Sequence, residues 1–245
     1  MKKIVLILAG GKGLRLHNNS APKQFLEIDH KPVIIHTMEV FSRHPQIDAI
    51  IVACLEGWIP FLRESIKRFG VGKVVSIVPG GDTGQDSIYH ALCAAREFSG
   101  GEEAIVLVHD AVRPLIDAKT IKENIVIAER HGNCITCAHV TETPVVKKSD
   151  GTMNFPNRHD VIVARAPQSF RLSELLSGHE RALAEDRHDF LDSCSLMANY
   201  GYGMTTLIGF EDNLKITTFT DFLLAETILR MRRENTTTKH EQDAG

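Results

Sequence analysis

The residues with the clearest chemical potential are glycines and cations near the start of the chain. Gly10, Gly11 and Gly13 follow a short apolar run. Two cations, Arg15 and Lys23, come a few residues later. Glycines let a backbone approach a ligand closely, backbone N–H groups can point at phosphate oxygens, and cations stabilise phosphate charge. The pattern predicts a loop that binds a nucleoside triphosphate, with a glycine-rich turn that binds nothing as the alternative.

The two best-known phosphate-binding loops do not fit this segment. A P-loop needs Gly-Lys-Ser or Gly-Lys-Thr at its end, whereas Gly13 is followed by Leu14 and Arg15. The dinucleotide fingerprint needs a third glycine, and Leu16 stands at that place. A different kind of nucleotide loop is therefore expected.

A second glycine pair, Gly80-Gly81, is followed by Asp82 and, five residues later, by Ser87. A bare backbone can approach a base, a carboxylate can bind sugar hydroxyls, and a hydroxyl can bind a base edge. We interpret this segment as a loop that recognises a nucleoside. The alternative is an ordinary turn in which Asp82 or Asp86 caps the next helix.

A third segment places Asp110 and Arg113 directly after an apolar run. Ligands of open α/β sheets bind at the carboxyl ends of the strands, which favours a binding role for both residues. A structural Asp–Arg salt bridge, with Pro114 starting a helix, is the alternative. Lys215 taken alone would be read as a solvated lysine.

Strand-like and helix-like segments alternate through the first half of the chain. The expected strands are Ile4–Ala9, Ala49–Cys54, Val74–Val78 and Ala104–Val108, and the expected helices are Val33–Arg43, Trp58–Phe69, Asp86–Phe98 and Ala118–His131. This alternation predicts a Rossmann-like α/β fold with a mostly parallel sheet covered by helices. The three candidate segments then lie together, because each follows a strand.

The alternation stops at residues 139–165, where Asp150-Gly151 between short apolar pairs predicts a β-hairpin. An isolated hairpin is marginally stable, so we expect this arm to pack on a second subunit. Further elements are expected at Leu172–Ala184, Phe190–Asn199, Met204–Ile208 and Phe219–Arg230. Residues 1–232 should form one domain, and the polar residues 233–245 a flexible tail.

Composition restricts the class of protein. The 245 residues carry a net charge of −3, which argues against a nucleic-acid polymer as partner. There is no apolar run of 18 residues, so no membrane span is expected. Five cysteines, an odd number, without an export signal favour the cytoplasm. Cys134 and Cys137 should face opposite sides of a strand, which excludes a shared metal.

Taken together, these segments resemble the CTP-dependent cytidylyltransferases of alditol phosphates. The motifs are Leu8-Ala9-Gly10-Gly11 with Arg15, Pro22-Lys23-Gln24, Gly80-Gly81-Asp82, His109-Asp110-Ala111-Val112-Arg113-Pro114, Pro167-Gln168 and Asn213-x-Lys215-x-Thr217. The resemblance extends from Ile4 to about Arg230. It implies a nucleotide-diphospho-sugar transferase-like fold with a protruding β-arm that joins a homodimer.

The resemblance also implies roles for individual residues. Those implied to bind the nucleotide are Leu8, Ala9, Gly10, Gly11, Gly81, Asp82 and Ser87. Those implied to bind the acceptor are Asp110, Arg113, Thr143, Arg158 and Lys215. The implied catalytic cations are Arg15, Lys23, Arg158 and Lys215. The implied cofactor is Mg²⁺, held mainly by the CTP phosphates with Asp110 as a weak ligand.

Three positions depart from the family pattern. Gly84 stands in place of an arginine, Ala166 in place of a threonine, and Leu191 in place of a threonine. The loss of a cation at Gly84 is expected to weaken nucleotide binding. The other two departures are expected to reshape the site without removing its phosphate-binding cations.

The acceptor implied by the resemblance is a small polyol phosphate. Val112, Ser169-Phe170 and Cys194 are more similar to the branch that acts on D-ribitol 5-phosphate and forms CDP-ribitol. The alternative is the branch that acts on 2-C-methyl-D-erythritol 4-phosphate in isoprenoid synthesis. A non-catalytic nucleotide sensor is an alternative of another class, disfavoured by the presence of Lys23 and Lys215.

Overall fold

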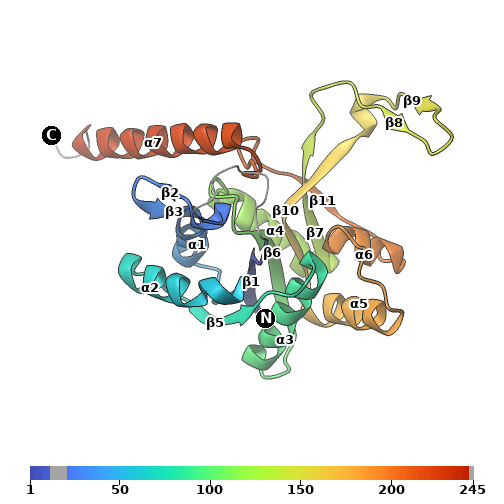
Figure 1. The fold of residues 1–245 in the computed structure, drawn as a ribbon, viewed down its shortest axis with the longest axis horizontal. Helices are drawn as coiled ribbons and strands as arrows, with labels where there is room; N and C mark the ends of the chain where they lie inside the picture. Colours follow the sequence, from blue (N-terminus) through green and yellow to red (C-terminus); the bar gives the residue numbers. More distant parts are fainter. Residues whose placement is uncertain (12–20, 243–245) are drawn as a thin grey trace.

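A seven-stranded sheet forms the centre of the molecule (Figure 1). The computed structural model describes residues 1–11 and 21–242, with side chains described up to residue 234. The strand order is β11-β7-β10-β6-β1-β4-β5. The bounds are β1 (Lys2–Ala9), β4 (Ala49–Cys54), β5 (Val74–Pro79), β6 (Ala104–Asp110), β7 (Asn133–His139), β10 (Ile162–Arg171) and β11 (Thr206–Ile208). Within this sheet β10 alone pairs antiparallel with its neighbours, so the prediction of a mostly parallel sheet is confirmed.

Helices cover both faces of this sheet. They are α1 (Val33–Arg43), α2 (Ile59–Phe69), α3 (Gly84–Ser99), α4 (Ala118–His131), α5 (Leu172–Ala184), α6 (Ser193–Asn199) and α7 (Phe219–Gln242). Short 3₁₀ turns are η1 (Lys23–Phe25), η2 (Glu56–Trp58) and η3 (Arg158–Asp160), and two small hairpins are β2 (Glu27–Ile28) with β3 (Lys31–Pro32) and β8 (Val146–Lys147) with β9 (Met153–Asn154).

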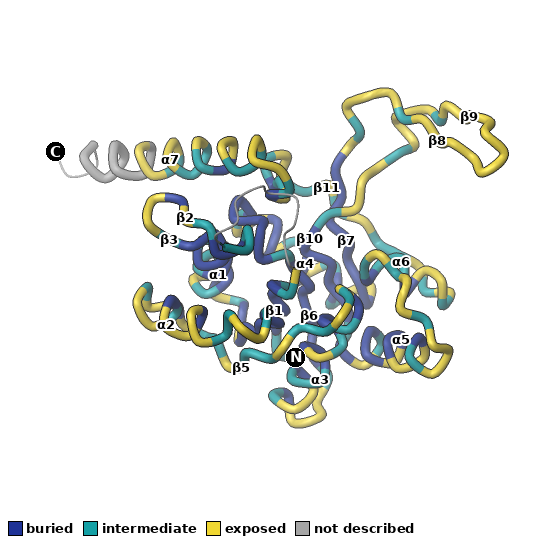
Figure 2. Tube along the Cα trace, viewed as in Figure 1, coloured by how far each residue is buried: buried dark blue, intermediate teal, exposed yellow. Residues whose placement is uncertain are grey.

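The first strand shows why the sheet is buried on both faces. Val5 and Ile7 belong to one hydrophobic core, with residues of α1, α2 and α4. Ile4 and Leu6 point the other way into a second core, with residues of α3, α5 and α6. All four are fully buried, and each contributes about 1.5–3 kcal/mol on burial. Figure 2 shows the central strands as the most buried part of the chain.

The cysteine pair on β7 follows the same alternation. Cys134 lies in the first core and Cys137 in the second, so the two side chains are on opposite faces as predicted. Burial raises the pKa of the Cys134 thiol to about 12, so the thiol stays protonated at neutral pH.

The arm at residues 139–165 leaves the body between β7 and β10 (Figure 1). Its tip is the predicted hairpin, in which Val146 pairs with Asn154 and Gly151 has the φ of +84° that the turn requires. Met153 and Phe155 are more than 60% exposed on it. The arm therefore exposes apolar side chains away from the core.

Strand β10 is the strand of the central sheet that was not predicted from the sequence. Its sequence contains Pro167, a residue that usually excludes a central strand. The register shifts between Ala164 and Gln168, and this irregularity accommodates the proline.

The C-terminal helix is longer than expected. It runs from Phe219 to Gln242, whereas the prediction ended it at Arg230. Ala225, Ile228 and Leu229 pack against the body and anchor the first half. Once nucleated, a helix gains one hydrogen bond per added residue, so a polar sequence can continue it. Among the described residues there is no helix long and apolar enough to cross a membrane.

Candidate active site

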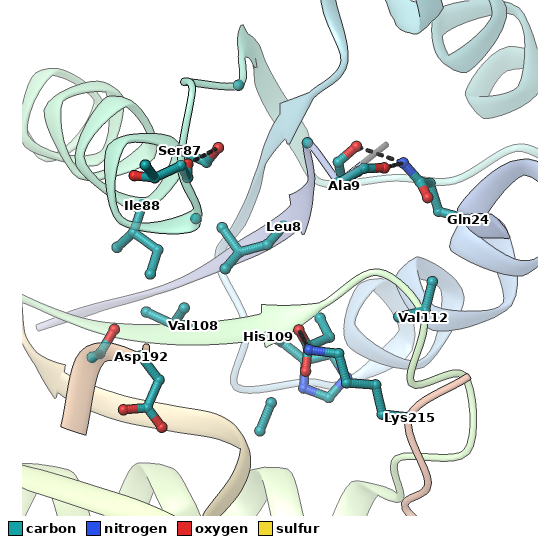
Figure 3. Close-up of a pocket in the computed structure, with 18 of the residues that line it drawn as sticks. Leu8, Ala9, Gln24, Ser87, Ile88, Val108, His109, Val112, Asp192 and Lys215 are labelled. Carbon is teal, nitrogen blue, oxygen red and sulfur yellow. Dashed lines mark hydrogen bonds and ion pairs between the residues drawn. The ribbon is translucent and has the colours of Figure 1, made fainter. Parts of the chain in front are cut away.

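A pocket of about 620 Å³ lies at the carboxyl ends of β1, β5 and β6 (Figure 3). Most of the predicted site residues line it. They are Leu8, Ala9, Gly10, Gly11, Lys23, Gly81, Asp82, Ser87, Asp110, Arg113 and Lys215. The parallel topology brings these segments together although Leu8 and Lys215 are 207 positions apart, as the position of the glycine and Asp110 motifs after strands predicted.

Three predicted site residues are not in this group. Arg15 lies outside the described residues. Thr143 and Arg158 are exposed on the arm and do not line the pocket of their own chain.

The glycine loop is held in place by a residue to which the sequence analysis gave no role. The side chain of Gln24 is buried, and its Nε2 donates hydrogen bonds to the carbonyl oxygens of Ala9 (2.8 Å) and Gly11 (3.0 Å). Figure 3 shows these bonds. Gln24 follows Lys23 in η1. The same turn therefore places a lysine at the pocket and holds the glycine loop by hydrogen bonds.

The second glycine pair packs directly against the first loop. A Cβ atom on Gly10 would lie 3.0 Å from Oγ of Ser87, and a Cβ on Gly81 would clash with Asp86. Ser87 Oγ accepts a hydrogen bond from the N–H of Gly81 and donates one to the carbonyl of Thr83. A larger residue at Gly81 would force the backbone to rearrange, and one at Gly10 would require Ser87 to shift, so Ser87 and the glycines together shape the loop.

The cap of α3 tests the alternative interpretation of this loop, in which Asp82 or Asp86 caps the helix. Thr83 is the N-cap, and Asp86 completes a capping box with it. Asp82 is not the cap, so that part of the structural alternative is wrong. Asp82 lines the pocket, and within the described residues the hydrogen bonds of the capping box go to Asp86 and not to the carboxylate of Asp82. It is available to a ligand.

The far end of the pocket contains an ion-paired cluster. Lys215 Nζ lies 2.8 Å from Oδ1 of Asp110, and Arg113 Nε lies 2.8 Å from Oδ2. Burial alone would raise the pKa of Asp110, but the charges and hydrogen bonds of Lys215 and Arg113 hold it far below its ordinary value. Asp110 is therefore ionised at neutral pH and orients both cations. The predicted Asp–Arg bridge exists, and it forms part of the pocket wall.

Buried backbone contacts fix this cluster. Arg113 Nη1 donates to the carbonyl of Asn213 at 2.9 Å, and Asn213 Nδ2 donates to the carbonyl of Ala166 at 2.7 Å. Asn213 is fully buried. Ile216 N–H donates to the carbonyl of Val112 at 2.9 Å, which holds the segment containing Lys215 beside β6.

A further polar group in the wall joins β10 to α6. Gln168 Nε2 donates to Oδ2 of Asp192, and its Oε1 accepts from the N–H of Cys194. Burial raises the pKa of Asp192, but hydrogen bonds from Ser195 and Gln168 outweigh it and lower the net value. Asp192 also caps α6, which therefore starts at Ser193 and not at Phe190 as predicted.

The described residues do not form a metal site of their own. No cluster of three histidine, cysteine or carboxylate side chains occurs in the described part of the chain. Both oxygens of Asp110 are engaged by cations, which disfavours the weak metal role predicted for it.

The pocket has the architecture of a nucleotide-binding α/β enzyme, with a glycine loop at one end and a cationic cluster at the other. The family model described as IspD, 2-C-methyl-D-erythritol 4-phosphate cytidylyltransferase, matches residues 3–231. The chain belongs to this cytidylyltransferase family and is a nucleotidyltransferase.

Two curated relatives and one solved structure illustrate the similarity. The chain is 42% identical over 227 residues to a ribitol-5-phosphate cytidylyltransferase of Vibrio parahaemolyticus, covering 92% of this chain and 95% of that one. It is 36% identical to a 2-C-methyl-D-erythritol 4-phosphate cytidylyltransferase of Clostridium botulinum, covering 93% and 97%. The 4-diphosphocytidyl-2C-methyl-D-erythritol synthase structure from Anaerococcus prevotii has a TM-score of 0.80 and 24% identity, covering 94% and 96%. That last likeness concerns the fold.

Proposed function

We propose that this protein transfers the cytidylyl group of CTP to D-ribitol 5-phosphate, forming CDP-ribitol and pyrophosphate. The observation that carries the proposal is the position of the Asp110, Arg113 and Lys215 cluster across one pocket from the glycine loop. One end suits a triphosphate and the other a second phosphate. The 42% identity to a ribitol-5-phosphate cytidylyltransferase supports the choice of acceptor.

The proposed reaction is a direct displacement at phosphorus. An oxygen of the acceptor phosphate forms a bond to the α-phosphorus of CTP, and the bond from that phosphorus to the pyrophosphate oxygen breaks. A phosphate monoester is already ionised, so no strong general base is needed. Positioning and neutralisation of charge supply the catalysis.

On the nucleotide side, the backbone of residues 8–11 faces the phosphates, and Lys23 with Arg15 stabilises the charge that develops on them. Gly81 and Asp82 bind cytosine and ribose, with Ser87 holding the loop that contains them. Mg²⁺ enters as part of the nucleotide substrate, bound to the phosphates of CTP.

On the acceptor side, Lys215 binds the phosphate, and Asp110 with Arg113 faces the polyol. Both relatives act on small polyol phosphates, so the phosphate contact does not separate them. A polar wall that hydrogen-bonds hydroxyl groups favours linear ribitol over a chain that carries a methyl branch.

We also propose that residues 1–232 form one catalytic domain that works as a homodimer in the cytoplasm. The exposed apolar side chains of Val146, Met153 and Phe155 suit burial against a second subunit. Thr143 and Arg158 on the same arm would then complete the acceptor site of the partner. The described cysteines are free thiols, which suits a reducing compartment.

The test is a pyrophosphate-release assay with purified protein, CTP, Mg²⁺ and D-ribitol 5-phosphate. The proposal expects pyrophosphate and CDP-ribitol in equal amounts, with release that requires both substrates. CTP binding without turnover on any polyol phosphate would contradict the proposal and favour the nucleotide sensor.

A further inference from the structure

One cation of the pocket wall has no part in the function proposed above. Arg165 is on β10 and lines the pocket beside Ala166. Its Nη1 donates a hydrogen bond to the carbonyl of Glu211 at 2.9 Å. Asn213 Nδ2 contacts the carbonyl of Ala166, the next residue along β10. Arg165 is therefore tied to the segment that carries Lys215, at the acceptor end of the pocket.

The charges at this end are unbalanced. A single carboxylate, Asp110, forms ion pairs with both Arg113 and Lys215. Arg165 has no carboxylate within ion-pair distance in the described part of the chain; the Glu211 contact is to a backbone oxygen. Burial and then the charge of Arg113 lower the pKa of Arg165, and the more distant carboxylate of Glu211 opposes this shift only in part. An anion bound between these cations would relieve their repulsion.

The remaining donors of Arg165 suit a phosphate. A guanidinium group has five N–H donors in a planar fork that matches two phosphate oxygens, and the Glu211 carbonyl uses one of them. The neighbouring side chain, Ala166, has no polar atom that could bind the same ligand. We propose that Arg165 binds the phosphate of the acceptor in its own subunit, together with Lys215.

This proposal rests on the proposed function, and its test separates the two. Steady-state kinetics of Arg165→Gln with D-ribitol 5-phosphate should show a KM for the acceptor raised about tenfold or more, because a charged hydrogen bond is lost. The KM for CTP should stay within about twofold. Arg165→Lys, which keeps the charge without the fork, should recover part of the loss. Arg96→Gln, at an exposed arginine outside the pocket, is the matched control for a lost charge.

Inorganic phosphate distinguishes a phosphate contact from a polyol contact. Phosphate should inhibit the wild-type protein in competition with the acceptor, and Arg165→Gln should weaken this inhibition by the same factor as the acceptor KM. Unchanged phosphate inhibition with a raised acceptor KM would place Arg165 on the polyol and overturn the proposal. An unchanged acceptor KM, or an equal rise in both KM values with a lower melting temperature, would also overturn it. Failure of the proposed function would appear in the wild type, as no turnover.

Discussion

The ammonium group of Lys215 lies 2.8 Å from Oδ1 of Asp110, although the two residues are 105 positions apart. The other oxygen of the same carboxylate binds Arg113. One partly buried negative charge thus orients two cations toward the pocket. Asp110 is a positioning residue in this arrangement, and its removal should affect both cations.

Replacing Asp110 by Asn should lower kcat/KM for the acceptor by tenfold or more, because two charge-assisted contacts of about 1.5–3 kcal/mol each are weakened. The KM for CTP should change much less. Asp189→Asn, at an exposed carboxylate outside the pocket, is the control. Equal kcat/KM values for wild type and Asp110→Asn would show that the ion pairs do not position the cations.

Lys23 and Arg15 are predicted to stabilise charge that develops during the transfer. Alanine at either position should lower kcat by about 10²–10³ while CTP affinity falls much less. Circular dichroism should show an unchanged fold. Near-normal kcat in either purified variant would remove that residue from the mechanism.

The arm predicts sites shared between subunits. If Arg158 acts in the partner, each site needs Lys23 from one chain and Arg158 from the other. Mixing inactive Lys23→Ala and Arg158→Ala subunits should restore about a quarter of the sites, as random pairing in a two-fold dimer requires. No recovery in verified heterodimers would mean that both residues act within one chain.

His179 is predicted to make stability depend on pH. Its ring is buried, neither nitrogen has a hydrogen-bond partner in the described part of the chain, and burial lowers its pKa from 6.5 to about 4, a shift that Asp86 partly opposes. The unfolded state binds the proton more tightly, so stability is complete above pH 6.5 and is lost as the pH falls toward 4.

The measurement for this prediction is urea unfolding across that pH range. His179→Leu should reduce the slope of unfolding free energy against pH by as much as about 1.4 kcal/mol per pH unit. Burial also lowers the pKa of His109 to about 4, so His109 should still contribute to the pH dependence of the unfolding free energy in the His179→Leu variant. An unchanged slope in the variant would mean that His179 does not titrate on unfolding.

The local sequence predicted the glycine loops and the Asp110 segment, because each follows a strand. The carboxyl ends of parallel strands lie at the same edge of the sheet, so these segments were expected to lie together. It did not predict β10, whose Pro167 fits only because of the irregular register beside it. The roles of Gln24 and Asn213 depend on backbone oxygens of distant segments, with Asn213 bonding 47 residues away. Such contacts leave no local pattern.

The choice of acceptor tests the central claim most directly. The measurement is kcat/KM for D-ribitol 5-phosphate and for 2-C-methyl-D-erythritol 4-phosphate, each at saturating CTP and Mg²⁺. A higher value is expected for ribitol 5-phosphate, because Asp110 and Arg113 are proposed to hydrogen-bond its hydroxyl groups. A higher value for the methylerythritol phosphate would contradict the proposed acceptor, while cytidylyl transfer itself would stand.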